Sequence, residues 1–94
     1  MAKAVEIGSL IDSHPKIAGG RPKIAGTGIS VMRLVIFYQS GHSPEEIAAE
    51  YPHINLAQVH AALAYYHANR AEIDSAIADE RAFFAAAESS QRAG

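Results

Sequence analysis

The residues of this sequence that could do chemistry are five histidines and a glycine-rich segment. His60 and His67 are seven residues apart, which on a helix separates them by about 10.5 Å along the axis, too far to share one metal ion. No cysteine is present, so disulfides, thiolate metal sites and thiol nucleophiles are excluded. No pair of side chains has the pattern of a nucleophile and its base. The sequence therefore predicts no catalytic residue, no metal site and no cofactor, and we expect a protein that is not an enzyme.

The glycine-rich segment from Ala18 to Gly28 has the composition of a phosphate-binding loop without its spacing. Five residues separate Gly20 from Gly26, and Thr27 follows Gly26 with no lysine between them, so the segment does not fit a Walker loop. It also lacks the third glycine of a dinucleotide fingerprint. A turn-rich arm that exposes its basic side chains is the favoured interpretation.

The formal net charge of −2 conceals an uneven distribution of charge. Residues 1–44 contain five Lys or Arg and two acids, whereas residues 45–94 contain three Arg and eight acids. No Lys or Arg lies between Arg33 and Arg70, so a DNA-reading helix in that interval would lack phosphate contacts. If nucleic acid is contacted, the candidate residues are the cations of the first half: Lys16, Arg21, Lys23 and Arg33.

The elements that position these residues change in character near Ser30. Glycine and proline are frequent between residues 14 and 28, which excludes a long helix there and favours short extended pieces. We expect such pieces around Leu10–Ile11, Ile24–Ala25 and Ile29–Val31. Residues 1–30 are therefore predicted to form a β-containing arm.

Three residues have N-cap character and begin three expected helices: Ser30, Ser43 and Asn55. Glu or Gln stands three residues after the second and third of them, which is typical of a capping box. Gly41 supplies the left-handed stop of the first helix. The spacing predicts a three-helix unit with helix-turn-helix outline over residues 31–70.

The last part of the chain, residues 71–94, is predicted to be an amphipathic helix and tail. Residues 56 to about 88 form either one long helix or two helices joined near Asn69. An apolar stripe continues through the candidate partner-binding residues Ile73, Ile77 and Phe84, with Phe83 beside it. The stripe either packs back on the three-helix unit or lies in a groove of another chain, and both interpretations stay open.

The composition indicates that another chain completes the fold. Alanine accounts for 19 of the 94 residues, so the core of this single small domain contains few large side chains. We expect a homodimer or a complex with a different protein. No apolar run reaches the roughly 20 residues of a membrane span, and we expect a cytoplasmic protein.

Several segments together resemble one bacterial family. Gly19 to Val31 is similar to the signature of the family called domain of unknown function 433. Ser43 to Ile47 after Gly41, Glu50 to Pro52, and Val59 to Tyr66 are similar to its later blocks, in order and spacing. The resemblance covers about residues 10 to 77. Many members have Arg at the position of Gly28.

The resemblance implies a homeodomain-like or winged-helix-like fold and no catalytic residues. Family members often look like the antitoxin partner of a PIN-like ribonuclease encoded beside them. We therefore expect a non-enzymatic, antitoxin-like protein that binds a PIN-like ribonuclease toxin or a similar partner through helical surfaces. The alternative is a DNA-binding transcriptional regulator that acts as a dimer and contacts DNA with its basic arm.

Overall fold

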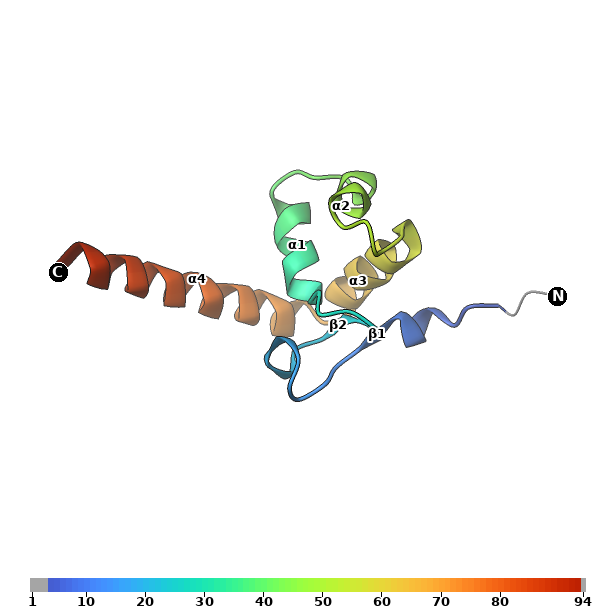
Figure 1. Cartoon of the computed structure of the whole chain (residues 1–94), viewed down its shortest axis with the longest axis horizontal. Helices are drawn as coiled ribbons and strands as arrows, with labels where there is room; N and C mark the ends of the chain where they lie inside the picture. Colours follow the sequence, from blue (N-terminus) through green and yellow to red (C-terminus); the bar gives the residue numbers. More distant parts are fainter. Residues whose placement is uncertain (1–3, 94) are drawn as a thin grey trace.

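The structure, a computed structural model, describes residues 4–93 and the side chains of residues 4–88. Residues 1–3 of the expected arm and Gly94 lie outside the described part. The predicted fold, mainly α with a β-containing N-terminal arm, is confirmed. The strands are β1 (Ile11–Asp12) and β2 (Lys23–Ile24), and the helices are α1 (Val31–Gln39), α2 (Pro44–Glu50), α3 (Leu56–Ala68) and α4 (Arg70–Ala93) (Figure 1).

The arm is a small antiparallel hairpin with two 3-10 turns. Ile11 pairs with Ile24 and Asp12 with Lys23, so both strands differ by one residue from their expected positions. The third expected extended piece forms only an isolated bridge, between Ser30 and Lys23, because the next residue already belongs to α1. The 3-10 turns at Ile7–Leu10 and Ala18–Gly20 were not expected, since single turns are too short to leave a periodic pattern.

A tight turn directs the chain from the arm toward α1. The Thr27 N–H donates to the Ile24 carbonyl at 3.1 Å, and Gly26 has a φ of 79° at the third position of that turn. A positive φ at this position is typical of a type II turn and favours glycine. The turn places Ser30 at the start of the first helix, where its Oγ accepts the Arg33 N–H at 3.1 Å.

The other predicted helix starts are confirmed as complete capping boxes. The Ser43 Oγ accepts the Glu46 N–H at 3.1 Å, and the Glu46 carboxylate accepts the Ser43 N–H at 2.8 Å. Asn55 and Gln58 make the same reciprocal pair at the start of α3. These bonds satisfy backbone N–H groups that the first turn of a helix leaves without partners.

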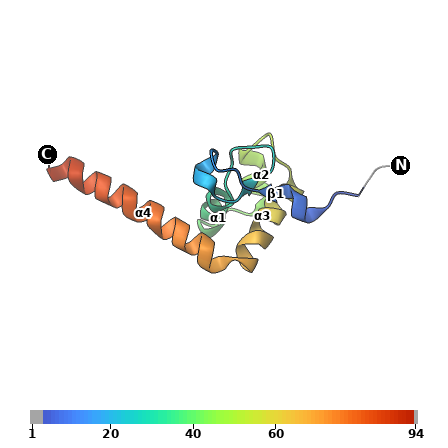
Figure 2. The same ribbon diagram turned by 90° about the horizontal axis from the view of Figure 1, so that it is seen from below.

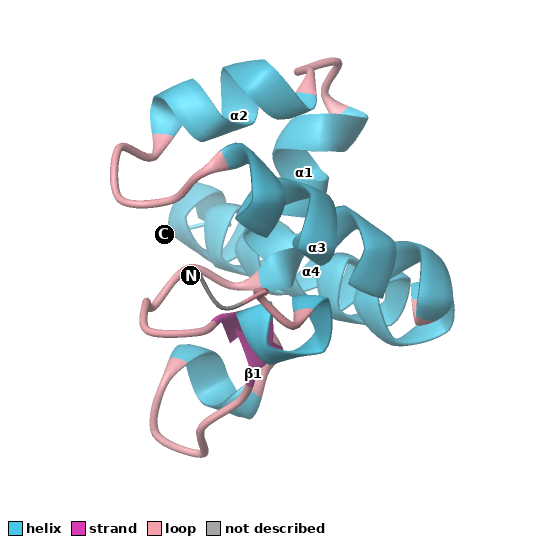
Figure 3. Cartoon of the chain, turned by 90° about the vertical axis from the view of Figure 1, so that its right-hand side faces the viewer, coloured by secondary structure: helices cyan, strands magenta, loops and turns pink. Residues whose placement is uncertain are grey.

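The core lies where α1 packs against α3, with α2 at one end and the arm beneath them (Figures 1 and 3). α2 contributes Ile47 and β2 contributes Ile24, both fully buried. The largest fully buried side chains are Ile24, Leu34, Ile47, Ile73, Val31, Val35 and Val59.

The chain turns sharply between α3 and α4 (Figure 2). Asn69 separates the two helices with φ −136° and ψ 45°, so the alternative with two helices is the correct one. From this elbow α4 projects away from the three-helix unit, and the molecule measures 62 Å along its longest axis against 28 and 23 Å. The backbone of α4 stays helical to Ala93, and no separate tail follows within the described residues. None of the helices in residues 4–93 combines the length and apolar character needed to cross a membrane.

Candidate functional site

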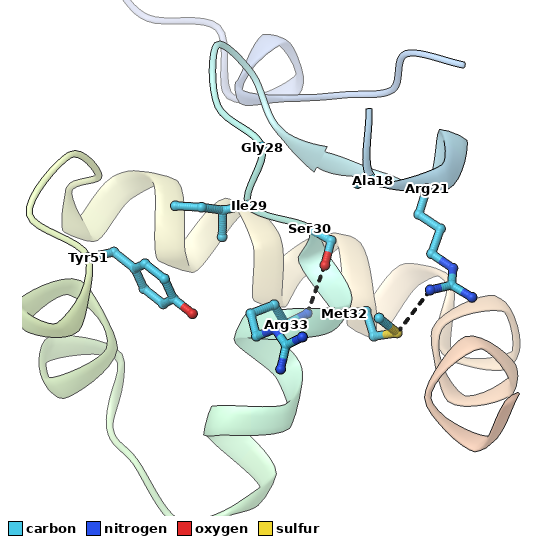
Figure 4. A pocket seen from close by; sticks show the side chains of 8 residues that line it. All are labelled: Ala18, Arg21, Gly28, Ile29, Ser30, Met32, Arg33 and Tyr51. Atoms are coloured by element: carbon cyan, nitrogen blue, oxygen red, sulfur yellow. Dashed lines mark hydrogen bonds between the residues drawn. The ribbon is translucent and has the colours of Figure 1, made fainter. Parts of the chain in front are cut away.

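A cavity of about 390 Å³ opens between the arm and the beginning of α1. Two of the four candidate nucleic-acid residues, Arg21 from the arm and Arg33 from α1, lie on its two sides (Figure 4). Met32 lies between the two arginines, and Ile29 lines the cavity on the side of Tyr51 (Figure 4). The complete lining is Ala18, Arg21, Gly28, Ile29, Ser30, Met32, Arg33 and Tyr51.

Each arginine at this cavity is held by a neighbour. The Arg21 Nη1 lies 3.9 Å from the sulfur of Met32, and the Arg33 Nη2 lies 3.6 Å from the Glu80 carboxylate on α4. The Arg33 side chain is about half exposed, so its pair with Glu80 leaves it open to a second anion. Tyr51 completes this side of the cavity (Figure 4). Burial raises the pKa of the Tyr51 hydroxyl and the charge of Arg33 acts against that shift, so the hydroxyl stays a neutral donor.

The other two candidate cations lie apart from the cavity. Lys16 is exposed in the loop after β1. Lys23 is only 4% exposed, and its Nζ lies 2.7 Å from the Asp12 carboxylate. The expectation that the Lys23 side chain is exposed is wrong, because the hairpin register places it opposite Asp12. Lys23 therefore supports the arm and is not available to a phosphate.

The apolar stripe of α4 divides into a buried part and an exposed part. Ile73 and Ile77 are 1% and 4% exposed and belong to the core. Phe83 and Phe84 are 69% and 59% exposed, and their rings meet edge to face with centroids 5.6 Å apart. The prediction that the stripe packs back on the three-helix unit is thus confirmed for the two isoleucines. The two phenylalanines lie beyond the core.

The exposed phenylalanines are connected to the arm by a shallow groove of about 430 Å³. Arg21 lies on one side of it, and Asp79, Glu80, Phe83 and Phe84 lie on the other. Arg21 therefore borders both this groove and the cavity at α1. The groove combines the two apolar rings with charges of both signs.

The outer face of α3, which a helix-turn-helix protein would present to DNA, is exposed and carries no cation. Its exposed side chains include Leu56, His60, Ala64 and His67. Among the residues whose side chains are described, no three His, Asp or Glu side chains cluster as metal ligands would.

Sequence reasoning did not single out Tyr51 or Glu80 as site residues. Glu80 stands seven residues after Ile73 and interrupts the apolar stripe, and an acid at such a position is a signal for an ion pair across two elements. Its partner Arg33 could not be inferred, because the contact depends on the angle between α1 and α4. Tyr51 left no comparable signal.

Comparison with known proteins places the chain in a family. A family model described as a protein of unknown function, DUF433, matches residues 11–66. The chain belongs to the DUF433 family. A crystal structure of a DUF433 member protein from Anabaena variabilis ATCC 29413 is 36% identical and similar in structure, with a TM-score of 0.71 over 74% of this chain and 69% of that one. No curated protein is significantly similar to the chain.

The matched DUF433 region contains one of the two candidate surfaces and not the other. It begins at β1 and ends at Tyr66 in α3, so the cavity with Arg21 and Arg33 lies inside it. All of α4, including the two exposed phenylalanines, lies after it. The predicted family is thus confirmed.

Proposed function

We propose that this DUF433 protein is a non-enzymatic, antitoxin-like binding module whose partner is a PIN-like ribonuclease or a similar protein. The docking surface is the exposed part of α4 with the groove beside it. The observation that carries the proposal is the exposure of Phe83 and Phe84, which extend the apolar stripe past the point where the core ends. The family resemblance supplies the class of partner.

Aromatic side chains exposed on a helix support binding to a protein groove. Phenylalanine buries a large area with few rotatable bonds, and such residues dominate the energetics of many interfaces. An amphipathic helix that lies in a groove is also a recurring mode of peptide recognition. The projecting α4 presents this kind of helix with its orientation already fixed, which reduces the entropy cost of binding.

The charges of α4 support a partner with a basic groove. Asp79, Glu80 and Glu88 lie close to the two phenylalanines in the sequence, against the single positive charge of Arg81. A ribonuclease must bind a polyanion, so its substrate groove carries positive charge. An acidic helix seated in that groove would match its charge and exclude RNA from it.

The experiment is co-expression with the product of the neighbouring open reading frame, which the proposal expects to be a PIN-like ribonuclease. We expect the tagged wild-type protein to copurify with it, and the double variant Phe83→Ala with Phe84→Ala to bind at least about tenfold more weakly. Leu56→Ala, which truncates an exposed apolar side chain on α3, is the matched control and should bind normally. Failure of the wild type to copurify, or binding by the double variant equal to the control, would exclude the proposal.

The cavity at α1 favours a second candidate function, a dimeric DNA-binding regulator that contacts phosphates with the arm. Arg21 and Arg33 border one cavity and Lys16 is exposed on the same arm, which makes three cations available. The cation-free outer face of α3 and the buried Lys23 weigh against it.

A titration of upstream DNA over a range of salt concentrations tests this second function. Binding through the arm falls steeply with salt, and Arg21→Ala with Arg33→Ala reduces the salt slope by about 2. Arg70→Ala removes an exposed arginine at the start of α4, apart from the cavity, and serves as the control. Absent or salt-independent binding rules out phosphate contacts by the arm.

A further inference from the structure

We propose that the outer part of α4 pairs in antiparallel orientation with the same segment of a second copy of this chain. The contact centres on Phe84, and Arg81 of each copy faces Glu88 of the other. This inference goes beyond the proposed function, because it concerns the protein alone without any other partner.

The paired face is the outward continuation of the face that α4 buries in its own core. Ile77 is 4% exposed, and Phe84 follows it by seven residues, so the two lie on the same side of the helix. Phe84 is 59% exposed and does not belong to the core. An apolar side chain in register with the core stripe but outside the core can still be buried by another helix.

Two opposite charges flank Phe84 on this face. Arg81 precedes it by three residues and Glu88 follows it by four, which are the spacings that place side chains on one side of a helix. Both side chains are exposed, and neither makes an ion pair within residues 4–88, where the pairs found are Lys23 with Asp12 and Arg33 with Glu80.

The order of these charges selects the antiparallel arrangement. A two-fold interface uses the same surface of both copies, so that surface has to complement itself. When the second helix runs in the opposite direction, Arg81 comes opposite Glu88 at both ends of the contact. A parallel arrangement places Arg81 opposite Arg81 and Glu88 opposite Glu88, which is repulsive.

The surface around Phe84 leaves room for a second helix. A shallow hollow of about 570 Å³ on the outer part of α4 is lined by Arg81, Phe83, Phe84, Ala85, Ala87 and Glu88. The alanines on the C-terminal side of the ring let a second backbone come close. In the described residues, only α4 itself contributes to this hollow.

Charge reversal on the purified full chain tests the arrangement. Sedimentation equilibrium should show a concentration-dependent dimer for the wild type. Arg81→Glu places Glu against Glu88 at both ends and should weaken the dimer at least about tenfold, and Arg81→Glu with Glu88→Arg should restore it to within about threefold. Phe84→Ala should weaken it by a similar factor. Glu50→Arg reverses an exposed charge at the end of α2, away from this segment, and is the control, with no expected change.

Circular dichroism of each variant checks that its helices are intact. A wild type that stays monomeric at every concentration overturns the proposal, and so does a dimer that Arg81→Glu and Phe84→Ala leave unchanged. The dimer is measured without ribonuclease or DNA, so a failure of the proposed function would not change the measured dimer affinity. In the same way, absence of the dimer would not decide whether the wild type copurifies with a ribonuclease.

Discussion

Lys23 shows how a single residue can have a role opposite to the one its charge suggests. Lys23 is enclosed by the protein and paired with Asp12, whereas Arg21 of the arm and Arg33 of α1 border an open cavity. Burying an ammonium group is costly unless it keeps a partner. The Lys23–Asp12 pair therefore stabilises the hairpin that places Arg21 beside α1.

Removing Asp12 should cost more stability than removing Lys23. Asp12→Ala leaves a buried ammonium without its partner, and we expect a loss of about 1–3 kcal/mol, moderated because the Asp12 side chain is half exposed. Lys23→Met fills the same space with an apolar chain and leaves only a hydrated carboxylate, so the loss should be smaller. Urea unfolding measures both. Glu6→Ala removes an exposed acid of the arm as the control, and an equal loss for Asp12→Ala and the control would show that the pair contributes nothing.

Glu46 makes the stability of α2 sensitive to pH. Hydrogen bonds from the Ser43 backbone and side chain hold the pKa of the Glu46 carboxyl below its ordinary value of 4.5. A lowered pKa in the folded state adds stability above the unfolded value, and this stability disappears as pH falls through the folded value. Between about pH 5 and about pH 3 the wild type should therefore lose more stability than Glu46→Gln.

Thermal unfolding at both pH values gives this comparison directly. Glutamine keeps the acceptor for the Ser43 N–H, so the variant isolates the effect of the charge. Glu45→Gln removes a carboxylate from the same helical turn that makes no bond to Ser43, and it should follow the wild type. Parallel curves for the wild type and Glu46→Gln would contradict the expectation.

At the scale of elements, α4 consists of an inner part that belongs to the core and an outer part that does not. Ile73 and Ile77 lie in the inner part, and the Arg33–Glu80 pair marks its boundary. From residue 81 onward every described side chain is exposed. The same helix thus serves as a core element and as a projecting surface.

Truncating a side chain should lower the free energy of unfolding by different amounts on the two sides of this boundary. Ile77→Ala removes a buried side chain and should lower the free energy of unfolding by about 2–5 kcal/mol. Phe84→Ala should change it by less than about 0.5 kcal/mol, because the ring is 59% exposed and lies outside the buried core. Urea unfolding at low protein concentration, where a dimer is not populated, gives both values. A comparable loss for the two variants would mean that Phe84 is packed within the chain.

The helix boundaries were predictable from sequence, whereas the contacts between helices were not. Ser30, Ser43 and Asn55 cap helices through bonds to residues three positions ahead, so the sequence contains the whole interaction. Whether the apolar stripe packed on this chain or on another depended on the angle at Asn69, which no local pattern determines. The result is a division that neither alternative anticipated: the isoleucines pack within the chain and the phenylalanines do not.

The candidate site was predictable to a similar extent. Arg21 and Arg33 were expected as cations of one basic half, but their meeting at one cavity depends on the hairpin and its turn. Lys23 failed as a candidate for the same reason, because its burial results from pairing with a strand eleven residues earlier.

At the scale of the whole molecule, stability should be distributed unevenly along the long axis. The three-helix unit holds the core, and α4 extends away from it (Figure 1), with every side chain from 81 to 88 exposed. A helix end that lacks packing opens at low cost.

Hydrogen exchange should reveal this distribution. At low protein concentration the amides of residues 81–93 should exchange orders of magnitude faster than those of α1 and α3. A partner that covers Phe83 and Phe84 should slow exchange in this segment and leave the core unchanged. Equal protection of α3 and residues 81–93 in the isolated protein would contradict the view of an independent outer part.

The elbow at Asn69 and the continuous helix after it determine the direction in which Phe84 points. Each residue of an α-helix advances the chain by about 1.5 Å and rotates it by about 100°. Inserting one alanine between Glu80 and Phe84 would thus hardly change the reach of the helix, yet it would turn the ring about a quarter of a revolution away from the Ile77 face. The direction of the Phe84 ring therefore depends on rotational phase counted from the core, and a length change of one residue alters it more than many substitutions would.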